Sequence, residues 1–136
     1  MNAVHVHLLM NHASIFAAIF SVLILLAAYF KQNAVLKQTA MVGFVMAALF
    51  AIPVFLTGED AEDAVKNLPG VVKALIEEHE EAADVALWLI EALGVISLLG
   101  LFAGKRVEGN RIFPVVLVLF SLAASGAISY TGYIGG

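Results

Sequence analysis

The chain has 136 residues, of which 62% are hydrophobic and 13% charged, and its formal net charge is −4. Charged residues usually make up about a quarter of a soluble domain, so this composition excludes the soluble globular and disordered classes. Because cysteine is absent, disulfides, thiolate metal sites and covalently attached c-type haem are also excluded. The sequence has no basic patch suited to nucleic acid, so no nucleic-acid partner is expected.

Long uncharged segments predict four membrane-spanning helices. Each is long enough to cross about 30 Å of hydrocarbon at a rise of 1.5 Å per residue. Lipid offers no partner for backbone polar groups, and the segments lack the alternation of barrel strands, so they are expected to be α-helices. We predict an all-α, polytopic four-helix transmembrane bundle, a single domain over residues 1–136, with spans at about 7–30, 38–57, 82–103 and 112–133.

Three of the four histidines lie at the start of the first predicted helix. His5 and His12 are seven residues apart and share a helix face, whereas His7 points about 160° away from His5. We expect the helix face that carries His5 and His12 to point toward the interior of the bundle. His12 lies inside the apolar segment, where placing an ionisable side chain in the membrane costs free energy. Such a residue is therefore a candidate for a functional role.

An acidic extramembrane connection follows the second predicted span, which we expect to end at Thr57-Gly58. Residues 59–67 are predicted to form a short acidic helix, which Leu68-Pro69-Gly70 then breaks. From residue 71 onward apolar residues recur at helical spacing, so helix three is expected to extend out of the bilayer. The helical connection between helices two and three, residues 58–81, is therefore strongly acidic.

The remaining loops predict the orientation in the membrane. The two short loops after the first and third spans carry five positive charges and one negative charge. These residues are Lys31, Lys37, Lys105, Arg106 and Arg111, with Glu108. By the positive-inside rule these loops face the cytoplasm. Both termini and the acidic connection are then periplasmic, if the protein lies in a bacterial inner membrane.

All four histidines are predicted to lie on the outer side, where two cofactor chemistries suit them. In the first, His12 and His79 supply two axial imidazoles to a b-type haem, with His5 and His7 as alternates. Small residues beside His79 leave room for a flat, bulky group; they are Ala82, Ala83 and Ala86. In the second, a divalent metal ion occupies a mixed nitrogen and oxygen site. Its ligands would come from Glu59, Glu62, Glu77, His79 and Glu80.

Glu91 is predicted to lie within the third span, where an ionised carboxylate is expensive. It is expected to face the bundle and either to be protonated or to pair with Ser97, Tyr130 or a serine of the fourth helix. A proton relay is the functional alternative. Taken as a whole, the sequence is compatible with three functions. The protein could be an electron carrier, a metal-binding membrane protein, or a cofactor-free accessory or scaffold subunit of a larger membrane complex.

Four short motifs resemble small four-span bacterial membrane proteins of the DUF2231 family. The motifs are HVHLLMNH at 5–12, TGEDAE at 57–62, IEEHEEAA at 76–83 and TGYIGG at 131–136. Some members of that family are joined to Rieske or c-type cytochrome domains. The resemblance therefore implies a place in electron transfer, a redox partner, and haem b held by His12 and His79.

Overall fold

The computed structural model describes residues 2–135 and is built from five α-helices. Their bounds are α1 Ala3–Lys31, α2 Ala34–Val65, α3 Lys73–Ala103, α4 Lys105–Glu108 and α5 Ile112–Ile134. Four of them are long and apolar enough to cross a membrane, and no strand occurs within residues 2–135. The predicted all-α bundle with four spans is confirmed. The short helix α4 is an addition that the sequence analysis did not predict.

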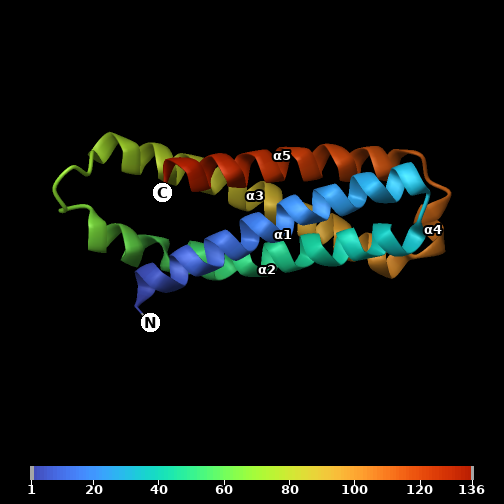
Figure 1. The fold of residues 1–136 in the computed structure, drawn as a ribbon, viewed down its shortest axis with the longest axis horizontal. Helices are drawn as coiled ribbons and strands as arrows, with labels where there is room; N and C mark the ends of the chain where they lie inside the picture. Colours follow the sequence, from blue (N-terminus) through green and yellow to red (C-terminus); the bar gives the residue numbers. More distant parts are fainter. Residues whose placement is uncertain (1, 136) are drawn as a thin grey trace.

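The four long helices form an elongated antiparallel bundle (Figure 1). Helix α1 packs against α2 and α5, and α3 packs against the same two helices, so α1 and α3 lie diagonally opposite each other. Both termini and the α2–α3 connection lie at one end, and α4 lies at the other (Figure 1). We call these the acidic end, comprising residues 3–13, 52–85 and 129–135, and the basic end, which holds the five predicted cytoplasmic Lys and Arg residues.

Asparagine side chains set the two tight connections at the basic end. The chain leaves α1 through Gln32, in the left-handed region at φ 49°. The Asn33 side chain then accepts a hydrogen bond from the backbone N–H of Leu36 at 3.0 Å, which caps α2. Similarly, the Asn110 side chain accepts hydrogen bonds from the first backbone N–H groups of α5, at 2.8 and 3.1 Å. Short capped connections of this kind make neighbouring helices antiparallel.

The predicted end of the second helix at Thr57-Gly58 is wrong. The acidic segment 59–67, which was predicted to be a separate short helix, is mostly the last part of α2. The helix continues to Val65. One glycine within a helix costs only about 1 kcal/mol, and the Thr57 hydroxyl donates to the Pro53 carbonyl at 2.7 Å instead of breaking the turn. The chain reverses at Leu68-Pro69-Gly70, where Gly70 adopts φ +90°. The predicted break there is confirmed, as is the long helix that follows it.

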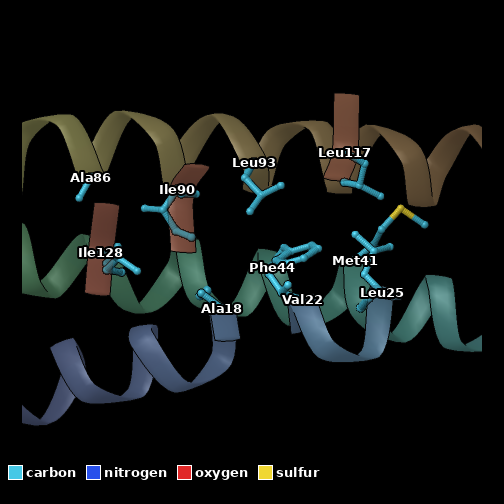
Figure 2. Packing of buried hydrophobic residues seen from close by; sticks show 14 residues of the cluster. Ala18, Val22, Leu25, Met41, Phe44, Ala86, Ile90, Leu93, Leu117 and Ile128 are labelled. Carbon is cyan, nitrogen blue, oxygen red and sulfur yellow. The ribbon is translucent and has the colours of Figure 1, made fainter. Parts of the chain in front are cut away.

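The apolar core occupies the middle of the bundle and its basic half. Figure 2 shows Phe44, Leu93 and Leu117 packed together with residues of α1, and all three are fully buried. Small residues let the helices approach closely: a Cβ added at Gly94 would lie 2.6 Å from the Cβ of Ala48. Close backbone approach of this kind is how membrane helices associate, since lipid provides no hydrophobic driving force between them.

The acidic end has almost no core. Among the described residues of this end, only Thr131 is buried, and its hydroxyl donates to the carbonyl of Ala127 in its own helix. The core stops at a layer formed by Ala51, Ala86 and Ile128. Apart from Thr131, the described side chains beyond this layer are exposed or only partly covered, and the histidines lie among them.

Candidate functional site

His7 is the histidine of α1 that turns toward the other helices. Its side chain is partly buried, and its Nδ1–H donates to the carbonyl of Val54 in α2 at 2.9 Å. Seven-residue steps from His7 lead to Ser14, Ser21 and Ala28, which are all buried. His7 therefore continues the packing face of α1 into the acidic end.

The expectation that His5 and His12 look into the bundle is wrong. Both side chains are exposed. The Nδ1 of His5 interacts with the N-cap side chain of Asn2 at 2.6 Å, and the Nδ1–H of His12 donates to the carbonyl of Leu8 at 2.7 Å. The physical reason is that serine and alanine occupy the opposite face of α1, where α2 must come close.

His79 lies on α3, diagonally across the bundle from His7. Its side chain is partly buried, and its Nδ1 is fully covered without a hydrogen-bond partner among the described residues. The ring rests on the backbone of Gly135, where an added Cβ would lie 2.7 Å from Nδ1. His79 is close enough to His7 for charges on the two rings to interact. The structure thus brings His79 together with His7.

The hydrogen bond to Val54 determines which nitrogen of His7 can act as a ligand. When Nδ1–H donates to a carbonyl, the neutral ring carries its lone pair on Nε2. Within residues 2–135, neither His7 nor His79 has its Nε2 buried without a partner or engaged in a hydrogen bond. Each ring therefore presents an available Nε2.

Small residues surround the two rings. Gly58 of α2 lies beside His7, with its ideal Cβ position 3.8 Å from Cε1 of the ring, and Gly135 of α5 lies beside His79. Below His79 on α3, Ala82 and Ala83 are partly buried and Ala86 is buried.

The carboxylates predicted as metal ligands are spread over the acidic end. Glu59, Glu77 and Glu80 are exposed, and Glu77 lies 4.0 Å from the ammonium of Lys73. The Glu62 carboxyl beside Glu80 raises the pKa of Glu80 through a shared hydrogen bond and like-charge repulsion. Within residues 2–135, no group of three or more His, Asp or Glu side chains is placed to hold a metal ion.

Glu91 lies on α3 within the apolar span and is partly buried. Its Oε1 is covered and has no hydrogen-bond partner among the described residues, and the same is true of the Ser97 hydroxyl. Tyr130 instead donates to Glu78 at 2.6 Å, a contact between α5 and α3 that the sequence analysis did not predict. The expected pairing of Glu91 with Ser97 or Tyr130 is therefore wrong.

Comparison with known proteins identifies no relative. No family model matches the chain, and no curated protein or solved structure does so either. The arrangement of the side chains is therefore the basis for any statement about function.

Proposed function

We propose that this chain is a small b-type cytochrome-like electron-transfer protein that holds haem b through His7 and His79. The observation that carries the proposal is the placement of two imidazoles on diagonally opposite helices at one end of a bundle, each with an available Nε2. His7 takes the role that the sequence analysis gave to His12, because His12 is exposed and bonded to its own helix.

The donor set suits this cofactor. Haem iron is commonly held by axial imidazoles, and cofactors in helical bundles are bound by side chains of facing helices. Gly58 beside His7 and the alanines below His79 suit a flat macrocycle, since they place no bulky side chain next to it. Bound haem b supplies one-electron transfer.

The chain's own groups hold and orient the ligands. The Val54 carbonyl fixes the tautomer and the direction of the His7 ring. Gly135 seats the ring of His79, since any side chain at this position would collide with it. Both are backbone contacts, and they keep the two imidazoles in place.

We further propose that the acidic end faces the periplasm of a bacterial inner membrane. Four helices are long and apolar enough to be in contact with a lipid bilayer. The five predicted cytoplasmic Lys and Arg residues all belong to the connections at the basic end or to the helix ends that flank them. The positive-inside rule then places the basic end in the cytoplasm.

The test is a visible spectrum of the detergent-purified protein, oxidised and then reduced with dithionite. We expect a Soret band and sharp low-spin α and β bands upon reduction, because two imidazoles impose a strong axial field. His7→Ala and His79→Ala should each lose these bands or become high-spin. The matched controls are His5→Ala and His12→Ala, which should keep the spectrum because both side chains are exposed.

Other outcomes would replace the proposal. A colourless protein containing stoichiometric metal by elemental analysis would show that the protein binds a divalent cation instead of haem. A protein with neither haem nor metal that purifies with another membrane protein would be an accessory subunit. Loss of the bands in His12→Ala together with their retention in His7→Ala would show that the ligand assignment is wrong.

A further inference from the structure

A second feature lies at the basic end, far from the histidines. An apolar groove of about 300 Å³ runs between α1 and α5, lined by Tyr29 of α1 and by Pro114, Val115, Val118 and Leu119 of α5. Val115 and Leu119 are 56% and 60% exposed, so the groove opens on the surface that faces lipid. Its apolar lining and its direction along the helices suit an acyl chain.

The ring of Tyr29 forms the α1 side of this groove. Its hydroxyl is covered by protein, so the groove itself is apolar. Tyr29 is two residues from the end of α1, a position typical of tyrosine at the membrane interface. The groove therefore reaches the depth of the lipid head groups.

Positive charge gathers around the head of the same groove. The ammonium of Lys37 lies 5.9 Å from the centre of the Tyr29 ring and 5.7 Å from that of Phe113. Arg111 precedes α5, one of the two helices that form the groove. The ion pairs found within residues 2–135 involve neither of these two cations. They are therefore available to an anionic group outside the protein.

We infer that the groove binds one anionic phospholipid. An acyl chain lies along α5 against Tyr29 and Val115, and the phosphate lies beside Lys37 and Arg111. The positive charge beside the groove favours an anionic lipid over a second copy of the chain as the molecule bound there. Two copies inserted in the same orientation would bring their basic ends side by side, which like-charge repulsion opposes.

The test is native mass spectrometry of the detergent-solubilised protein, equilibrated with equal amounts of phosphatidylglycerol and phosphatidylcholine that carry identical chains. We expect one tightly retained lipid, with phosphatidylglycerol preferred. Lys37→Gln should reduce this preference about five-fold, since a lysine near an anionic lipid surface contributes about 1 kcal/mol. The matched charge control is Lys73→Gln at the acidic end, which should leave the preference unchanged.

Filling the groove tests the position of the acyl chain. Val115→Trp should abolish retention of both lipids, whereas Val95→Trp, at an exposed position of α3 outside the groove, should retain them as in the wild type. Leu119→Trp places the same bulk at a second exposed position of the groove and should abolish retention even if Val115→Trp fails to fold. Equal retention of the two lipids by the wild type, or unchanged retention in both groove variants, would overturn the inference. A dimer that Val115→Trp dissociates would assign the groove to a second copy.

Discussion

The two ends of this bundle differ in how they are held together. In the middle and the basic half, fully buried apolar residues such as Phe44 and Leu93 fill the space between helices. At the acidic end only Thr131 is buried among the described residues, and polar contacts such as that of Tyr130 with Glu78 join the helices instead.

This difference separates the part of the chain that maintains the fold from the part that is available for function. Close-packed membrane helices leave no space for a ligand, and a substitution in them is felt immediately. The acidic end contributes little packing, so its histidines and glycines are free to serve a cofactor. Substitutions of equal size should therefore have unequal effects at the two ends, and four predictions test this.

The largest effect is expected from Phe44→Ala in the core. Phe44 is fully buried, and truncation of a buried phenylalanine typically costs about 3–5 kcal/mol because a cavity remains. The control is Phe55→Ala in the same helix, where the side chain is 58% exposed, and its effect should be much smaller. The free energy of unfolding in mixed micelles measures both. Equal losses would show that the core does not dominate stability.

Glycine substitutions compare the two ends directly. Gly94→Ala should destabilise the fold by about 1–3 kcal/mol, because the new Cβ meets the rigid Cβ of Ala48. Gly135→Ala also creates a collision, but with the ring of His79, which can swing aside at an end without a core. Its stability loss should be much smaller, and if the chain holds haem as proposed, the visible spectrum should change.

Gly126→Ala is the control for both, since a Cβ at Gly126 would meet nothing within 4 Å. It should leave stability and spectrum unchanged. If Gly135→Ala destabilised the protein as much as Gly94→Ala does, the acidic end would be as tightly packed as the middle of the bundle.

Two buried serines test the contribution of polar contacts to the packed region. The Ser14 hydroxyl donates to the Ala47 carbonyl at 2.8 Å across the α1–α2 interface. Ser14→Ala should therefore cost about 1 kcal/mol, as interhelical hydrogen bonds in membranes do. Ser97→Ala is the matched control, because the Ser97 hydroxyl is buried without a partner among the described residues. A thermal unfolding series should show a lower Tm for Ser14→Ala alone.

The smallest effect is expected from Glu80→Gln, at the acidic end and outside the predicted span 82–103. The pKa of Glu80 is raised in the folded protein, so the fold binds this proton more tightly than the unfolded chain does. The associated stabilisation is fully present below the unfolded pKa and is lost as the pH rises through the raised pKa. Glu80→Gln should therefore match the wild type in acid and be slightly more stable near neutral pH.

Glu81→Gln is the control for this pH dependence, since its side chain points about 100° away from that of Glu80 around α3. The measurement is Tm against pH for the three proteins. A constant difference between Glu80→Gln and the wild type at every pH would show that Glu80 does not interact with Glu62.

The histidine site illustrates where sequence reasoning succeeded and where it failed. The sequence placed all four histidines toward one end, and the structure confirms this, because hydropathy determines where each span begins. The prediction of His12 as a ligand depended on which face of α1 points toward the other helices. The position of His12 inside the apolar segment suggested a buried side chain, and this was misleading. A better signal was present: His7, Ser14, Ser21 and Ala28 recur every seven residues, and small residues at this spacing mark the face where helices approach.

Sequence alone determined the number of spans, the all-α class, and the separation of acidic from basic connections, because these follow from local composition and from the need to satisfy backbone polar groups in lipid. Only the tertiary structure decided that α1 and α3 lie diagonally, that His7 and not His12 approaches His79, and that Tyr29 lines a groove beneath Lys37. These features depend on how each helix is rotated against its neighbours. Helix rotation is set by the contacts of small residues across all four interfaces at once, and no single segment of sequence contains that information.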